Sequence, residues 1–183
     1  MNYASEDLIN EHRDILFGLR ILQEIVKAAE QSGDADIKDI NDMIDFLRLF
    51  ADKCHHGKEE GLMFPALEEA GIPNERGPIG QMLKEHIQGR QYIAEMAASV
   101  GSGALQADRF TQAAADYIDL LREHIQKENT VLFPMADRIL PDDRQQQLLE
   151  QFEIFEEEVI GKGIHERLHE TLHKLGEKYL NTK

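Results

Sequence analysis

The chain has 183 residues, a formal net charge of −15 and a single cysteine, Cys54. Nucleic-acid binding requires clustered Lys and Arg, so this charge argues against a nucleic-acid partner. No apolar run approaches the roughly 18–20 residues of a membrane-spanning helix, and the N-terminal stretch "MNYASEDLINEHRD" has no apolar signal region. One cysteine permits no intramolecular disulfide, which fits a reducing compartment, so we expect a cytoplasmic protein without a membrane partner.

Apolar residues recur at helical spacing in five successive segments. These segments are expected at about residues 5–31, with Ser5 as N-cap, at 36–70, 78–101 and 105–140, and after Pro141, with an interruption at 161–163. No stretch shows the sustained alternation of a strand. Because short connections favour antiparallel neighbours, the sequence predicts an all-α, up-down four-helix bundle over residues 1–140. A C-terminal helical extension over residues 141–183 is expected to pack on the same domain.

The second and fourth helices contain related stretches, "CHHGKEEGLMFPAL" and "EHIQKENTVLFPMA". When their Phe-Pro pairs are aligned, His55 falls on His124 and Glu59 falls on Glu128. Residues four apart lie on the same face of a helix. The repeated His-x-x-x-Glu therefore predicts that each of these helices directs one imidazole and one carboxylate to the same place.

The second helix doubles both residue types, as His55-His56 and Glu59-Glu60. The residues one, two and more helical turns before His55 are apolar, whereas those at the same spacing before His56 are mostly polar. We therefore expect His55 and Glu59 on the inner face, with His56 and Glu60 more to one side. Glu60 is kept as the reserve carboxylate.

Two further histidines interrupt apolar seams, His12 in the first helix and His86 in the third. A core that buries four imidazoles and two carboxylates must satisfy all of them, because an unpaired buried charge costs several kcal/mol. The set has too many ligands for one tetrahedral zinc site. Bridging carboxylates mixed with imidazoles suit a pair of iron ions, with manganese or zinc as alternatives. The expected ligands are His12, His55, Glu59, His86, His124 and Glu128.

The two related stretches, with "NEHRDI" upstream and "KEHIQGR" between them, resemble the hemerythrin-like HHE cation-binding family over roughly residues 5–140. The resemblance implies a hemerythrin-like four-helix bundle around a non-haem di-iron centre with carboxylate bridges and an oxo or hydroxo bridge. The six residues just named match the ligands of the family.

The sequence departs from the oxygen-carrying hemerythrins in two places. Those carriers have two histidines one turn apart on the third helix, whereas His86 has Met82 one turn before it and Arg90 one turn after it. The carriers also use His-x-x-x-x-Asp on the fourth helix, where this chain has His124 and Glu128. The resemblance therefore implies an extra water at the site or a fifth histidine from elsewhere, and it does not favour simple reversible oxygen carriage.

The C-terminal stretch "HERLHETLH" contains the HExxH of zinc metalloproteases, from His165 to His169. Only fourteen residues follow His169, too few for the substrate-binding fold of a peptidase. The simplest interpretation is an amphipathic helix with flanking histidines. In the alternative, glycines 161 and 163 let the chain turn back so that His165 or His169 covers the bundle mouth and supplies a further imidazole.

These features predict a non-haem di-iron protein that binds, senses or reacts with a small oxidant: O2, peroxide or nitric oxide. The imidazoles and carboxylates hold the metals, and the apolar bundle limits access of water. Three alternatives remain open at this point: iron binding or storage, an iron or oxygen sensor without turnover, and a metal-free helical interaction module. The sequence names no electron donor.

Overall fold

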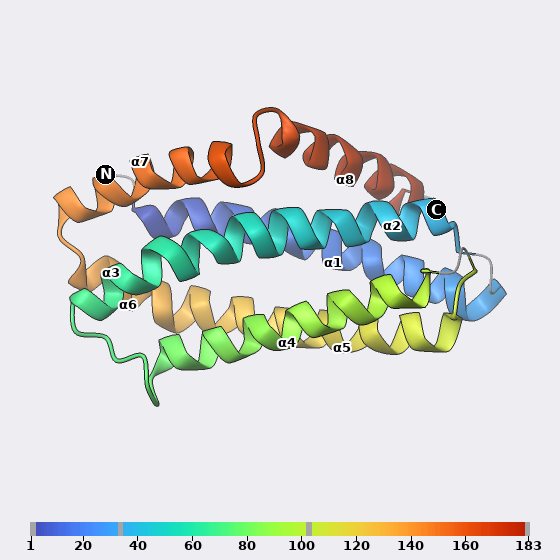
Figure 1. Ribbon diagram of the computed structural model, residues 1–183, viewed down its shortest axis with the longest axis horizontal. Helices are drawn as coiled ribbons and strands as arrows, with labels where there is room; N and C mark the ends of the chain where they lie inside the picture. The colour runs from blue at the N-terminus through green and yellow to red at the C-terminus, as the bar shows by residue number, and fades with distance from the viewer. Residues whose placement is uncertain (1–2, 33–34, 102–103, 182–183) are drawn as a thin grey trace.

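The computed structural model describes residues 3–32, 35–101 and 104–181, and within these ranges it contains helices and turns but no strand. The all-α prediction is therefore confirmed. Four long rods run side by side in alternating directions (Figure 1), and the second and fourth rods are each made of several helical segments in line. The first three rods comprise α1 (Ala4–Ser32); α2 (Ile37–Phe46), η1 (Leu47–His56), η2 (Glu59–Met63) and α3 (Phe64–Glu69); and α4 (Pro78–Ser99). The fourth comprises α5 (Ala107–Lys127), η3 (Glu128–Leu132) and α6 (Phe133–Ile139).

The expected helix boundaries agree with these bounds within a few residues, with one correction. The first helix begins at Ala4, and the hydroxyl of Ser5 donates to Asp137 Oδ1 at 2.6 Å instead of capping the helix. The prediction of Ser5 as N-cap is therefore wrong. The turns expected near residues 33–34 and 102–103 lie outside the described residues.

The bundle core is divided into two apolar clusters that lie on either side of a polar layer. One cluster holds Ile15, Ala51, Ile93 and Leu121, and the other holds Leu8, Met63, Met82 and Leu132. The buried histidines and glutamates fall between these positions on all four rods. Side chains of the two clusters therefore close the layer at both ends and keep bulk water away from it.

The two composite rods widen into a π-helical turn just before a proline. In the second rod the Phe64 N–H donates to the carbonyl of Glu59, five residues back, and in the fourth rod Phe133 does the same with Glu128. The residue that follows each phenylalanine is proline, which has no N–H and whose ring clashes with the carbonyl four residues earlier. A π turn relieves that clash and changes which residues face the core.

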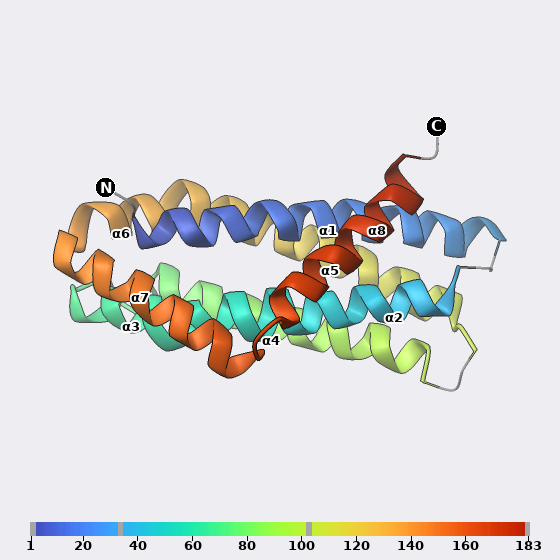
Figure 2. The ribbon, with the colours of Figure 1, turned by 90° about the horizontal axis from the view of Figure 1, so that it is seen from above.

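The C-terminal segment forms α7 (Asp142–Val159) and α8 (Ile164–Leu180), which lie along the face made by α1 and the second rod (Figures 1 and 2). Gly161 and Gly163 join them with φ of 88° and 76°, the left-handed region that glycine adopts without strain. The interruption expected at 161–163 is confirmed. Buried leucines of α8, among them Leu172, belong to the first apolar cluster.

None of the described helices combines the length and the low polarity that a bilayer span needs.

Packing of α8 can be tested with Leu172, which is buried against α1 and lies in ordinary contact range of Gly18. We expect Leu172→Ala to lower the free energy of unfolding by about 2–5 kcal/mol, because the truncation leaves a cavity in the core. Lys174→Ala, two residues along on the exposed side of the helix, should change it by less than about 0.5 kcal/mol. Chemical denaturation measures both values. Equal stabilities of the two variants would show that α8 does not contribute to the fold of the bundle.

Candidate metal centre

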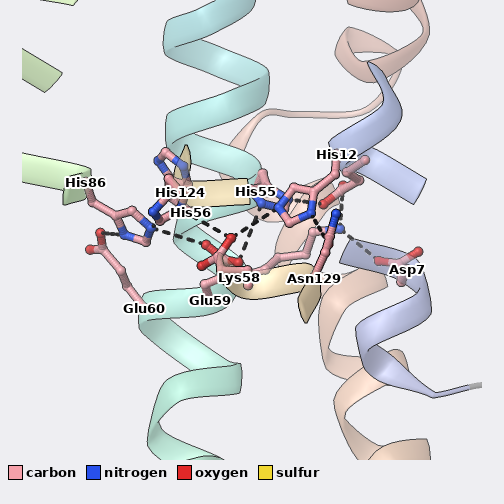
Figure 3. A network of polar contacts seen from close by, with 12 residues as sticks. Asp7, His12, His55, His56, Lys58, Glu59, Glu60, His86, His124 and Asn129 are labelled. Atoms are coloured by element: carbon pink, nitrogen blue, oxygen red, sulfur yellow. Dashed lines mark hydrogen bonds and ion pairs between the residues drawn. The ribbon is translucent and has the colours of Figure 1, made fainter. Parts of the chain in front are cut away.

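Seven buried side chains converge in the polar layer as two overlapping groups of potential metal ligands (Figure 3). Within each group, one ligand atom per residue lies within 4.8 Å of all the others. The first group contains His12, His55, Glu59 and Glu128, and the second contains His56, Glu59, His86 and His124. Glu59 belongs to both groups, so one of its oxygens can serve each side. All six ligands expected from the sequence are thus brought together, and His56 joins them.

The Nε2 atoms of four histidines face the two carboxylates at 3.2–3.5 Å. Glu128 Oε2 lies 3.2 Å from both His12 Nε2 and His124 Nε2, so this carboxylate also spans the two groups. Glu59 approaches His55 Nε2 through Oε1, at 3.5 Å, and His86 Nε2 through Oε2, at 3.4 Å.

Most of these ligand atoms make no hydrogen bond, the exception being His86 Nε2 and His124 Nε2, which contact each other at 3.2 Å. Both oxygens of Glu59 and of Glu128 are buried with no hydrogen-bond partner, and so are the Nε2 atoms of His12 and His55. A buried polar atom without a partner costs free energy, and a buried charge costs more. A metal ion among these atoms would satisfy them, because imidazole nitrogen and carboxylate oxygen are metal ligands. The donor set therefore fits a metal centre.

The opposite nitrogen of each of these four imidazoles is held by an outer oxygen. If each Nδ1–H donates to that oxygen, the Nε2 lone pair is left pointing inward, the arrangement typical of histidines that bind metals. The four contacts are His12 Nδ1 to Asn129 Oδ1 at 2.8 Å, His55 Nδ1 to Glu11 Oε2 at 2.9 Å, His86 Nδ1 to Glu60 Oε1 at 2.7 Å, and His124 Nδ1 to Glu85 Oε2 at 2.9 Å.

Each of the three outer carboxylates is also paired with a cation, through the second oxygen in Glu11 and Glu85 and through the same oxygen, Oε1, in Glu60. Lys58 donates to Glu11 Oε1 at 2.7 Å. Burial opposes ionisation of Glu11, but hydrogen bonds and charges of His55 and Lys58 outweigh it and lower the pKa to about 2. Arg90 donates to Glu60 at 2.6 Å, and Lys127 pairs with Glu85.

The pKa of Glu85 is likewise about 2. Burial again acts in the opposite direction, and hydrogen bonds from His124, Gln81 and Lys127 overcome it. The outer carboxylates consequently stay ionised near neutral pH and hold the imidazoles in place.

The predicted sideways orientation of His56 is wrong. Its side chain is buried and stacks on His86, with ring centroids 3.9 Å apart and an interplanar angle of 14°. The cause is the π-helical course of η1, where the Gly57 N–H reaches the carbonyl of Asp52, so that neighbouring histidines both face the core. Neither ring nitrogen of His56 has a hydrogen-bond partner. Burial, helped by nearby His86 and His124, lowers its pKa well below the ordinary value, so this fifth imidazole is neutral and able to bind a metal.

The remaining candidate residues lie outside the two groups. Glu60 points away from the centre and takes the outer role described above. His165 and His169 pack against Phe50 instead, each with a ring-centroid distance of 5.3 Å. The structure therefore does not bring either C-terminal histidine to the ligand groups, and the fifth imidazole in these groups is that of His56.

Glu11 and Glu85 were missed in the sequence, although a signal was present. Each directly precedes a predicted ligand, in the stretches "NEHRDI" and "KEHIQGR". Their side chains reach across the bundle to a histidine on another rod, His55 and His124 respectively. A carboxylate beside one ligand thus orients the ligand of a neighbouring helix.

Glu11, Cys54 and Glu156 form a further group of potential metal ligands, but their surroundings do not suit a metal ion. The ammonium of Lys58 already lies there, 2.7 Å from Glu11 and 3.7 Å from Glu156. Burial, together with the charge of Glu11, raises the pKa of the Cys54 thiol to about 12, and a protonated thiol is a poor metal ligand.

Comparison with known proteins identifies the family. The model of the hemerythrin HHE cation-binding domain matches residues 4–136. The chain belongs to this family. The resemblance to this family and the bundle fold are therefore confirmed, and the histidine and glutamate clusters are able to hold a metal ion.

The chain is also similar to individual proteins. An uncharacterised protein of Mycobacterium tuberculosis is 27% identical over 165 residues, which cover 87% of this chain and 64% of that protein. An iron–sulfur cluster repair protein, YtfE, of an Enterobacter species is 34% identical over 88 residues, 45% of this chain and 40% of that protein. The chain thus spans less than two thirds of the mycobacterial relative. No solved structure matches it significantly.

The outer carboxylates can be tested through Glu85. We expect Glu85→Gln to weaken metal binding by about 10–100-fold, because a neutral amide holds the His124 imidazole less firmly and makes it a poorer donor. Glu123→Gln is the matched control, since Glu123 is exposed and adjoins the same histidine. Competition with a chromophoric chelator gives both affinities. Equal metal affinities of the two variants would show that Glu85 does not support metal binding.

Metal loading should also release protons. Burial disfavours a charged His124, but the charge of nearby Glu128 and the hydrogen bond to Glu85 outweigh it and raise the pKa of His124 to about 10. The apoprotein therefore carries a proton on this imidazole near pH 7, and a metal must displace it. We expect metal affinity to rise with pH up to about 10. Calorimetry in two buffers of different ionisation enthalpy detects the released proton, and a binding heat independent of the buffer contradicts this expectation.

Proposed function

We propose that the two ligand groups, which include Glu59 and Glu128, would hold an oxo- or hydroxo-bridged pair of iron ions, and that the protein binds or reacts with a small oxidant in the cytoplasm. The oxidant is O2, peroxide or nitric oxide. The observation that carries the proposal is the set of buried nitrogen and oxygen atoms that face one another, most of them without a hydrogen bond. Iron, when bound, supplies the redox chemistry.

The number and kind of donors support two ions. Five imidazoles and two carboxylates are more ligands than a single ion would use, and they would be shared between two. A small molecule would bind at a position that these residues leave open. Manganese and zinc accept the same donor types and are the alternatives that metal analysis must exclude.

The protein's own residues orient the ligands and exclude water. The outer oxygens fix the imidazole rings, and Lys58 keeps Glu11 ionised behind His55. The two apolar clusters close the layer, so charges within it act in a medium of low dielectric constant. Such surroundings favour controlled access of a small uncharged molecule over access of bulk solvent.

Two other functions use parts of the same evidence. Iron storage or sensing without turnover requires only the ligand groups, and it predicts no reaction with the oxidant. A metal-free interaction module does not explain why buried carboxylates lack hydrogen-bond partners, so it is the least favoured of these functions. The name of one relative concerns iron–sulfur cluster repair, which supports iron chemistry, but the match covers less than half of either chain.

The proposal is tested on protein purified without chelator. We expect about two irons per chain, absorption bands of an oxo-bridged iron pair after exposure to air, and a spectral change when the reduced protein meets O2, peroxide or nitric oxide. Glu59→Gln should lose both ions, because Glu59 belongs to both ligand groups, whereas His12→Ala should retain more iron. Iron content and absorption spectra of all three proteins give the answer.

Each outcome has a distinct meaning. Two irons without any response to an oxidant would favour storage or sensing. A single tightly bound zinc, or no metal, would contradict the di-iron proposal.

A further inference from the structure

A second group of metal-binding side chains lies outside the bundle core, where α8 begins. His165 and His169 are one turn apart on α8, and their Nε2 atoms are 3.3 Å apart. The ring centroids are separated by 4.4 Å. About a third of each side chain is exposed, 28% and 35% respectively, so an ion can reach the pair from solvent.

The spacing of these nitrogens suits a tetrahedral ion. Zinc binds imidazole nitrogen at about 2.0–2.1 Å, so two such ligands in tetrahedral geometry are roughly 3.3–3.4 Å apart. The separation of 3.3 Å between His165 Nε2 and His169 Nε2 therefore needs almost no adjustment. Both rings also rest against Phe50, which limits their rotation.

Carboxylates from two other helices complete the surroundings. Asp14 Oδ2 of α1 lies 3.8 Å from His169 Nε2, and Glu156 Oε1 of α7 lies 3.7 Å from His165 Nδ1. Both separations exceed a hydrogen bond, so neither carboxylate is committed to its histidine. Asp14 lies beside His169, but the ligand atoms of the three residues are not all within 4.8 Å of one another, so the partly exposed Asp14 side chain would have to swing toward His165 to become a third ligand. Glu156 lies on the Nδ1 side of His165, where it favours a proton on that nitrogen. The two Nε2 atoms hydrogen-bond to each other, and a metal would take the place of the proton between them.

We propose that His165, His169 and Asp14 form a surface site for a divalent ion of the zinc type, separate from the core centre. Imidazole and carboxylate together select late first-row divalent ions, and three protein ligands leave a fourth position for water. The net charge of −15 draws cations toward this surface. The site needs neither the core ligands nor their metal, and it does not rest on the function proposed above.

Such an ion would clamp two parts of the chain that are distant in sequence. α8 starts directly after the Gly161–Gly163 turn, and a bound ion ties this start to α1 through Asp14. Glu156 also approaches Lys58, at 3.7 Å, and Lys58 holds the Glu11 that orients His55. The surface site is therefore next to the network that supports the core centre.

The test is a zinc titration of the full-length protein by calorimetry, with cobalt as a spectroscopic probe of tetrahedral coordination. We expect one more ion per chain in the wild type than in the double variant His165→Ala/His169→Ala. His173→Ala is the matched control, because this histidine lies one turn further along α8 with 76% of its side chain exposed. It should keep the additional ion. Asp14→Asn, which preserves the packing of both histidines, should weaken binding at this site about tenfold or more.

A background without the core centre separates this site from the other. In Glu59→Gln the additional ion should remain, and the tetrahedral cobalt spectrum should disappear only when His165 and His169 are also replaced. The proposal is overturned if the double variant binds as many ions as the wild type, or if His173→Ala loses the additional ion as well.

Discussion

The structure depends on one constraint: two carboxylates and five imidazoles are buried in a helical bundle, and most of their inward atoms have no hydrogen-bond partner. Burial of this kind is costly unless another group compensates the charge. Glu59 and Glu128 have no exposed surface, so water cannot compensate them. A metal cation would do so, and the groups around the layer keep the imidazoles turned toward the place where it would lie. Metal binding is then expected to stabilise the fold.

The two halves of the site share one arrangement of three residues. In each half a glutamate contacts a histidine on a neighbouring rod, and the lysine three residues after that histidine pairs with the same glutamate. Lys58, Glu11 and His55 form one such set, and Lys127, Glu85 and His124 form the other.

The symmetry is broken at two pairs of equivalent positions. Glu60, backed by Arg90, holds His86, whereas the neutral Asn129 holds His12. His56 lies beside His86, and its equivalent in the fourth rod is Ile125. A carboxylate partner makes an imidazole a stronger donor than an amide does. Each group has four members, but the group with His86 contains three imidazoles and the group with His12 contains two, and an amide holds one of those two. The two ligand groups are therefore chemically distinct.

The sequence predicted much of this because helix periodicity is a local property. Apolar spacing located the rods, and the repeated His-x-x-x-Glu identified the face on which His55, Glu59, His124 and Glu128 lie. His56 was assigned to the wrong face because the periodicity of an ordinary α-helix was applied to a π-helical segment. A proline inside a helical pattern is a recognisable sign of such a distortion. The partners Glu11 and Glu85 could not be assigned, since their contacts cross between rods and depend on how the rods are rotated.

The most direct test of the account is X-ray absorption spectroscopy at the iron edge of the metal-loaded protein, combined with the same measurement on His56→Ala. The account predicts a metal–metal scattering path of roughly 3–4 Å, as in two-metal sites, and a mixed shell of imidazole nitrogen and carboxylate oxygen. It further predicts a loss of imidazole scattering when His56 is removed. A spectrum without a second iron within that distance, or one dominated by solvent oxygen, would contradict a shared centre bridged by Glu59 and Glu128.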